Sequence, residues 1–249
     1  HLPESHKQLA IAGQQDVWAQ LAARVIAENP DPEAYCLVTS IGSGELIRQL
    51  LRRSTYRLLV VDADAEQVAR LRQQTSAAGL YGTRIAIQHG ELSSASLPPY
   101  FASVIVSEHA IPGDARSVYR SLRPYGGNAY LPADNGAFEQ LQAQHQAGQL
   151  PGAEFQRSGN LVRITRSGAL AGSSNWTHEY GDAANSLTSA DELVKAPFGV
   201  LWFGGPAADG ELFYNRHYWA PSPTIIDGRM FLEGPQVFAA IDVYTGRIL

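Results

Sequence analysis

The stretch CLVTSIGSGELIRQLL, residues 36–51, decides the fold that this sequence predicts. Its first three residues are apolar, and a Gly-Ser-Gly turn follows at residues 42–44. Apolar side chains then recur at helical spacing over residues 46–51, which indicates an amphipathic helix. The order is therefore strand, glycine turn, helix.

Strands and helices alternate on both sides of this stretch. An amphipathic helix is predicted over residues 8–29, where Asn29-Pro30 ends it. Further buried strands are predicted at residues 58–61, 85–87, 104–106 and 129–131, and further helices at residues 65–77 and 117–122. Continuous apolar strands alternating with amphipathic helices indicate a parallel sheet covered on both faces. Right-handed crossovers make it a doubly wound, Rossmann-like α/β fold.

The character of the sequence changes after residue 131. Residues 138–146 predict a polar helix, and residues 153–166 alternate like an antiparallel hairpin that turns at residues 158–160. From residue 167 the chain is rich in Gly, Pro, Trp and Tyr. We therefore predict a Rossmann-like domain over residues 1–166 and an irregular or β-containing tail over residues 167–249.

Charge and composition argue against several classes of protein. The 249 residues are 45% apolar and carry 19 basic against 24 acidic side chains, a net charge of −5, which argues against general affinity for nucleic acid. No apolar run approaches the length of a membrane span, and residues 1–7 lack the apolar core of a signal peptide. We expect no nucleic-acid partner and no membrane partner.

Metal and thiol chemistry are not indicated either. The single cysteine, Cys36, excludes an intrachain disulfide and lies in an apolar run, which predicts a buried structural thiol. No H-E-x-x-H, H-x-H or acidic cluster has the spacing of metal ligands, so we predict no metal site.

The glycine turn and Asp62 carry the predicted chemistry. Gly42 and Gly44 let backbone N–H groups approach a ligand at the start of a helix. Asp62 ends the next strand twenty positions after Gly42, where a carboxylate can accept hydrogen bonds from both ribose hydroxyls of an adenosine. A tight turn with a surface aspartate is the alternative.

The third glycine of a dinucleotide fingerprint is absent. The pattern G-x-G-x-x-G requires glycine where this chain has Ile47, so the pyrophosphate of NAD would lack its usual close approach. An NAD-dependent oxidoreductase therefore remains only as an alternative.

Residues 33–131 resemble the class I S-adenosylmethionine-dependent methyltransferases. The stretches similar to that family's motifs are residues 38–44, 60–64, 89–92, 104–108 and 122–127. The resemblance implies S-adenosylmethionine as cofactor, with the glycine turn lining it, Asp62 at the ribose, residues 90–92 at the adenine and residues 107–108 near the methionine end. The predicted cofactor-binding residues are Ser40, Gly42, Ser43, Gly44, Asp62, Ala63, Asp64, Gly90, Glu91, Leu92, Ser107 and Glu108.

Two positions depart from the family's pattern. Ser40 stands where many members have an acidic residue, and Leu46 stands where a third glycine is common. Both departures favour the alternative that the domain is a non-catalytic scaffold or interaction module.

His109 is the candidate catalytic residue. It follows the fourth predicted strand, where a methyltransferase's substrate meets the cofactor, and it could act as a base or contact the substrate. A loop histidine in solvent is the alternative. The leading hypothesis is a methyltransferase that acts on a small molecule with an oxygen, nitrogen or sulfur nucleophile. The compartment stays open, and the cytoplasm is favoured if the protein depends on S-adenosylmethionine.

The tail has a resemblance of its own. Residues 176–182, 202–205, 227–234 and 239–249 look like segments of quinoprotein-type (PQQ-like) β-propellers. They supply about one blade, whereas a propeller needs at least four. We therefore expect this chain to be a fragment of a longer protein. Its aromatic tail is expected to pack against the first domain or a second copy of the chain, which would make a homo-oligomer.

Overall fold

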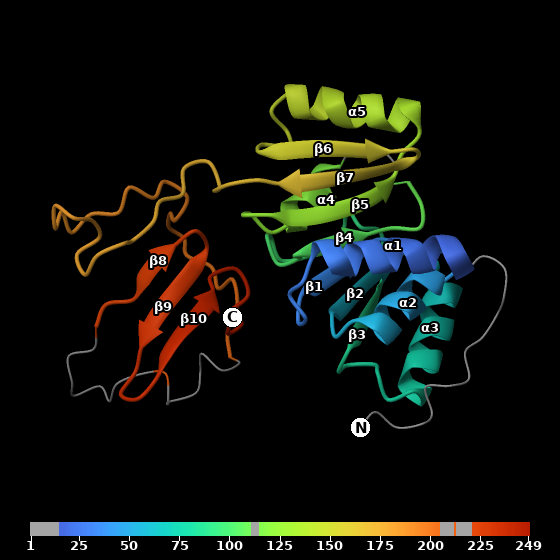
Figure 1. The fold of residues 1–249 in the computed structure, drawn as a ribbon, viewed down its shortest axis with the longest axis horizontal. Helices are drawn as coiled ribbons and strands as arrows, with labels where there is room; N and C mark the ends of the chain where they lie inside the picture. Colours follow the sequence, from blue (N-terminus) through green and yellow to red (C-terminus); the bar gives the residue numbers. More distant parts are fainter. Residues whose placement is uncertain (1–14, 111–114, 205–211, 213–220) are drawn as a thin grey trace. The chain divides into compact units, whose positions relative to one another are not determined.

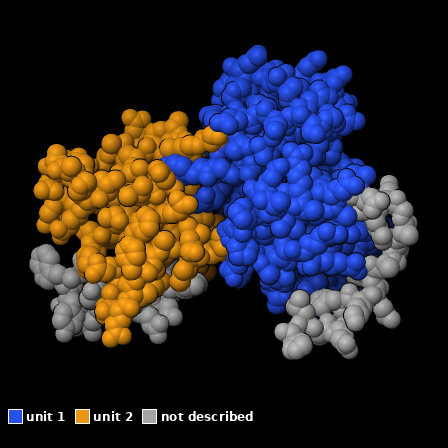
Figure 2. Space-filling view, in the orientation of Figure 1, with its two compact units in different colours: residues 1–166 blue, residues 167–249 orange. Residues whose placement is uncertain are grey.

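The chain divides into two compact units, residues 1–166 and residues 167–249 (Figure 2). The structure is a computed structural model, and it describes residues 15–110, 115–204, 212 and 221–249. The first seven residues predicted as helix, 8–14, lie outside the described residues.

A seven-stranded mixed sheet forms the centre of the first unit (Figure 1). Its strands are β1 (Tyr35–Val38), β2 (Arg57–Asp62), β3 (Ile85–His89), β4 (Val104–Val106), β5 (Gly127–Pro132), β6 (Ala153–Ser158) and β7 (Leu161–Arg166). They lie in the order β3-β2-β1-β4-β5-β7-β6. The first five are parallel, and β7 is antiparallel to both β5 and β6. The predicted doubly wound sheet with an antiparallel hairpin at its end is confirmed.

Five helices pack on the two faces of this sheet. They are α1 (Gln15–Glu28), α2 (Glu45–Arg53), α3 (Ala65–Ala77), α4 (Arg116–Ser121) and α5 (Asn135–Gln146). Side chains of α1, α2 and α3 share one buried cluster with the sheet, and side chains of α4 and α5 share the other. The connection from β1 to β2 therefore runs on one face and the connection from β4 to β5 on the other, as a doubly wound sheet requires.

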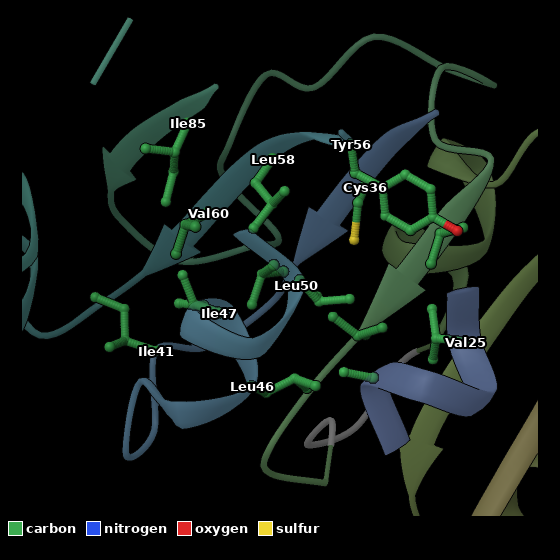
Figure 3. Packing of buried hydrophobic residues seen from close by; sticks show 14 of the residues in the cluster. Val25, Cys36, Ile41, Leu46, Ile47, Leu50, Tyr56, Leu58, Val60 and Ile85 are labelled. Carbon is green, nitrogen blue, oxygen red and sulfur yellow. The ribbon is translucent and has the colours of Figure 1, made fainter. Parts of the chain in front are cut away.

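Strand β1 contributes to both clusters because its side chains alternate between the two faces. Cys36 lies in one cluster with Ile47 and Leu50 of α2 (Figure 3). Val38 belongs to the same cluster, whereas Leu37 belongs to the opposite one. Each of these five side chains is at most 1% exposed. Burial raises the pKa of the Cys36 thiol, so this cysteine is the buried structural residue that the sequence predicts.

A carboxylate fastens the end of α1 to the sheet. Glu28 accepts hydrogen bonds from Arg24 within the helix, from the Tyr130 hydroxyl on β5 and from Arg163 on β7, all at 2.7–2.9 Å. Burial by itself raises the pKa of Glu28. The three hydrogen bonds together outweigh it and lower the pKa from 4.5 to about 2.

The tail folds around a three-stranded antiparallel sheet of β8 (Thr224–Ile226), β9 (Arg229–Glu233) and β10 (Phe238–Asp242). Trp176 pairs with Ile225 of β8, and the indole of Trp202 donates a hydrogen bond to the Val243 carbonyl. The side chain of Trp202 leaves no room for a Cβ at Gly246. In the described part of the chain no helix has the length and apolar character needed to cross a membrane.

The Glu28 anchor can be tested by replacing Glu28 with Gln. We expect the free energy of unfolding at pH 7 to fall by about 1–2 kcal/mol, because three donors lose an anionic acceptor. The folded-state pKa lies below the unfolded one, so the difference between wild type and variant should be complete above pH 4.5. It should disappear as the pH falls from 4.5 towards 2.

Chemical denaturation over a series of pH values measures this difference. The matched control is Glu66→Gln on α3, whose ion pair with Arg70 is exposed and should contribute at most about 0.5 kcal/mol. Equal losses in the two variants would contradict the anchoring role.

Candidate functional site

A cleft of about 640 Å³ opens at the carboxyl edge of the parallel strands. The order of the strands reverses between β1 and β4. From β1 the chain continues to β2 and β3 on one side, and from β4 it continues to β5 on the other side. Open α/β sheets bind ligands in the crevice at this switch point. The cleft lies there, since residues that follow β1, β2, β3 and β4 all line it.

Asp62, the last residue of β2, is held by the backbone of two turns. Its Oδ2 accepts a hydrogen bond of 2.6 Å from the Ile41 N–H, and its Oδ1 accepts one of 2.7 Å from the Asp64 N–H. A carboxylate offers about four lone-pair sites, so each oxygen can accept one further hydrogen bond from a ligand. The carboxylate of Asp62 is therefore fixed in place and still able to bind a pair of hydroxyl groups.

Glu108, at the end of β4, caps the glycine turn. Its Oε2 accepts a hydrogen bond of 2.6 Å from the Ser43 N–H, and its Oε1 accepts one of 2.8 Å from the Leu46 N–H. Gly44 provides no side-chain cap for α2, so the carboxylate of another strand satisfies the free N–H groups at the start of this helix. Only 8% of Glu108 is exposed.

Gly42 makes this approach possible. Its φ of +56° is favourable only for glycine, and a Cβ at this position would lie 2.5 Å from Oε2 and 2.8 Å from Cβ of Glu108. Glycine is therefore required at residue 42 because the Glu108 carboxylate lies against it. From sequence alone, this glycine indicated the close approach of a ligand to the backbone.

Asp64 has a local role. It is the N-cap of α3, and its Oδ1 accepts hydrogen bonds from the N–H groups of Glu66 and Gln67. Together with a contact from the Gln67 side chain, these hydrogen bonds lower the pKa of Asp64.

The structure brings nine of the thirteen predicted site residues to the cleft. They are Ser40, Gly42, Asp62, Ala63, Gly90, Glu91, Leu92, Ser107 and His109. Ser43, Gly44, Asp64 and Glu108 do not line it, because they form and cap the turns at the starts of α2 and α3.

Six residues that line the cleft were not predicted. They are Thr39, Val61, Gln67, Ser93, Ala110 and Ser117. Thr39, Val61, Ser93 and Ala110 each adjoin a predicted position, so a window one residue wider around each strand end would have included them. Gln67 lies in the first turn of α3, three residues after Asp64. Ser117 on α4 carries no sequence signal. The buried hydroxyl of Thr39 has no hydrogen-bond partner among the described residues, and a ligand could supply one.

Three polar side chains form a connected group where β1 and β4 end. The Ser40 hydroxyl lies 3.3 Å from the Ser107 hydroxyl and 3.4 Å from Nδ1 of His109. The Ser107 hydroxyl donates to the His109 carbonyl at 2.6 Å and accepts from the His109 N–H at 3.2 Å. The histidine, which sequence alone left as a loop residue or a base, is thus attached to the end of the neighbouring strand.

The charge of the cleft is negative. Asp62 and Glu91 line it, and no lysine or arginine is among the described residues that do. Nor do the described residues include a group of three or more His, Cys, Asp or Glu side chains that could hold a metal ion. Such a lining attracts a positively charged ligand and repels phosphate groups.

No family model matches the chain, and neither does any curated protein sequence. Solved structures of methyltransferases are similar to it over about 60% of its length. A candidate S-adenosyl-L-methionine-dependent methyltransferase from Methanococcus maripaludis is 17% identical, with a TM-score of 0.49, over 61% of this chain and 85% of that one.

Two further solved structures have a similar sequence identity, TM-score and coverage. A candidate sarcosine dimethylglycine methyltransferase from Galdieria sulphuraria is 16% identical, with a TM-score of 0.44, over 56% of this chain and 60% of that one. The tRNA methyltransferase TrmI from Aquifex aeolicus is 14% identical, with a TM-score of 0.47, over 65% of this chain and 72% of that one. The likeness is one of fold and indicates no acceptor. The comparisons give no support to a propeller blade in residues 167–249.

The contact between Gly42 and Glu108 predicts different effects of alanine at the two glycines of the turn. In Gly44→Ala the new Cβ would meet only Ile41, at 3.9 Å. We therefore expect the free energy of unfolding to fall by about 1–2 kcal/mol, the cost of a left-handed backbone for alanine. Gly42→Ala has that cost and also displaces the Glu108 carboxylate, which should add about 1.5–3 kcal/mol.

Denaturant unfolding of the two variants side by side measures the difference. Equal destabilisation would mean that Glu108 is not held against the turn. In the double variant Gly42→Ala/Glu108→Ala the two losses should add to less than their sum, because either change alone already disrupts the contacts of the Glu108 carboxylate with the turn.

Proposed function

We propose that the first unit binds S-adenosylmethionine and transfers its methyl group to a small molecule with an oxygen, nitrogen or sulfur nucleophile. The observation that carries the proposal is that Asp62, residues 90–92 and the hydroxyls of Ser40 and Ser107 line one cleft at the switch point. Its volume of about 640 Å³ falls within the range of about 300–1,000 Å³ that is usual for sites of this ligand size.

The residues present fit the parts of that cofactor. Asp62 would accept hydrogen bonds from the ribose hydroxyls with its two remaining lone-pair directions. Residues 90–93 would flank the adenine, and the hydroxyls of Thr39 and Ser40 would meet the methionine end. When bound, the cofactor supplies a methyl group on a positively charged sulfur, and the negative lining of the cleft favours that charge.

The same features argue against a dinucleotide. A pyrophosphate in this fold binds to the N–H groups of the glycine turn, but the Glu108 carboxylate accepts from Ser43 and Leu46 there. Ile47, where the third glycine would stand, is 1% exposed and packs in the core. An NAD-dependent oxidoreductase is therefore the weaker candidate.

The tail and the partners extend the proposal. Large apolar side chains of the tail are exposed, including Leu187, Val194, Phe198, Val200, Phe203 and Phe238. We propose that they serve self-association of the chain, which sedimentation would detect as a dimer. Neither nucleic acid nor a membrane is part of the proposed function.

Cofactor binding is tested by calorimetric titration with S-adenosylhomocysteine, the product form of the cofactor. We expect binding to the wild type and a loss of about 10- to 100-fold in affinity for Asp62→Asn, because hydrogen bonds to a charged acceptor contribute about 1.5–3 kcal/mol. Glu66→Gln, which removes a carboxylate from α3 away from the cleft, is the control and should bind as the wild type does.

Absence of heat and of any thermal shift at millimolar ligand would overturn the proposal and leave the non-catalytic scaffold as the better reading. A parallel titration with NADH tests the competing cofactor. We expect no binding of NADH, because the glycine turn is already capped. If the protein bound NADH and did not bind S-adenosylhomocysteine, an NAD-dependent oxidoreductase would replace the methyltransferase as the proposed function.

A further inference from the structure

We propose that His109 is a general base, held by Ser40 and Ser107 in the tautomer that carries its proton on Nδ1, and that the acceptor is a molecule whose nucleophile must lose a proton. The inference rests on the proposed function, which supplies the methyl donor. It goes further by assigning the proton of each hydroxyl and by narrowing the class of acceptor.

Ser107 is buried, with 1% of the residue exposed. Its hydroxyl has a single proton, and the contact of 2.6 Å to the His109 carbonyl requires that proton, because a carbonyl oxygen can only accept. The Ser107 oxygen is then limited to accepting, as it does from the His109 N–H. Its contact with Ser40 must therefore be donated by Ser40.

The hydrogen bonds of Ser40 determine the tautomer of His109. Ser40 has used its only proton towards Ser107, so its oxygen must accept in the contact of 3.4 Å with Nδ1 of His109. Nδ1 consequently carries the ring proton of the neutral imidazole, and Nε2 keeps a lone pair. The opposite tautomer would set the lone pairs of Ser40 and Ser107 against each other at 3.3 Å.

Nε2 is free to act on a ligand. It has no hydrogen-bond partner among the described residues, and His109 lines the cleft together with Ser40 and Ser107. The titratable side chains that share the cleft with it are Asp62 and Glu91, and Glu108 precedes it in the chain.

The methyl transfer moves one proton from the acceptor to Nε2 of His109. A bond forms between the acceptor's oxygen, nitrogen or sulfur atom and the methyl carbon, while Nε2 takes the proton that this atom loses. The carbon–sulfur bond breaks, and its electron pair stays on sulfur, so the sulfonium donor becomes a neutral thioether. His109 is left as an imidazolium that still donates from Nδ1 to Ser40, and it returns its extra proton to water.

The tautomer can be measured without any substrate. Long-range ¹⁵N–¹H correlation spectra of the full chain, labelled at histidine and recorded at pH 8, distinguish a protonated ring nitrogen from one with a lone pair. We expect Nδ1 of His109 to be the protonated nitrogen, and the signal is assigned by its loss in His109→Gln. In Ser40→Ala the acceptor for Nδ1–H is gone, so the proton should shift towards Nε2.

Ser93→Ala is the matched control, because Ser93 lines the same cleft and, among the described residues, no hydrogen bond joins it to His109. Its spectrum should equal that of the wild type. Protonation of Nε2 in the wild type, or an unchanged spectrum in Ser40→Ala, would overturn the inference while binding of S-adenosylhomocysteine would still uphold the proposed function. Failure of the wild type to bind S-adenosylhomocysteine removes the methyl donor and overturns both, whichever tautomer is found.

Discussion

The structure of the switch point depends on the carboxylate of Glu108. One side chain from β4 accepts hydrogen bonds from the turn that follows β1 and from the first turn of α2. Without it, the N–H group of the buried Leu46 would lose its acceptor, at a cost of about 1–3 kcal/mol. The same contact requires glycine at residue 42, because any Cβ there would meet Glu108. Strand, turn and helix are thus joined through one anion.

This internal anion also determines what the cleft can accept. In related folds the start of the helix after the first strand attracts phosphate groups, since its N–H groups are free. Here those groups are already satisfied, and the side chains that line the cleft add negative charge from Asp62 and Glu91. A ligand without phosphate and with a positive centre matches such a site. The electrostatics of the cleft and the capping of the helix therefore favour the same class of cofactor.

The sequence predicted what depends on residues close together in the chain. Strand, glycine turn and helix were readable over residues 36–51, and the spacing of Asp62 placed it correctly at the end of β2. The N-cap role of Asp64 could have been read in the same way, because an aspartate directly precedes the helix that starts at Ala65, although we predicted a cofactor-binding residue there. The hydrogen bond between Glu108 and Ser43 could not be predicted from the sequence. The two residues are 65 positions apart, and no local pattern records which strand end faces which turn. For the same reason the sheet formed by β8, β9 and β10 could be anticipated only as short extended pieces.

The two departures from the family's pattern acquire a structural meaning. Leu46 stands where a glycine is common, and its side chain is fully buried in the core, while its N–H donates to Glu108. Ser40 stands where an acidic residue is common, and its hydroxyl connects Ser107 to His109. An acidic side chain at residue 40 would be a second anion beside Asp62 and could not donate to Ser107. Both residues therefore make specific contacts at these positions. From sequence alone, these two departures favoured a non-catalytic scaffold. In the structure they fit the cleft, because Leu46 donates to the Glu108 carboxylate that caps α2 and Ser40 contacts His109.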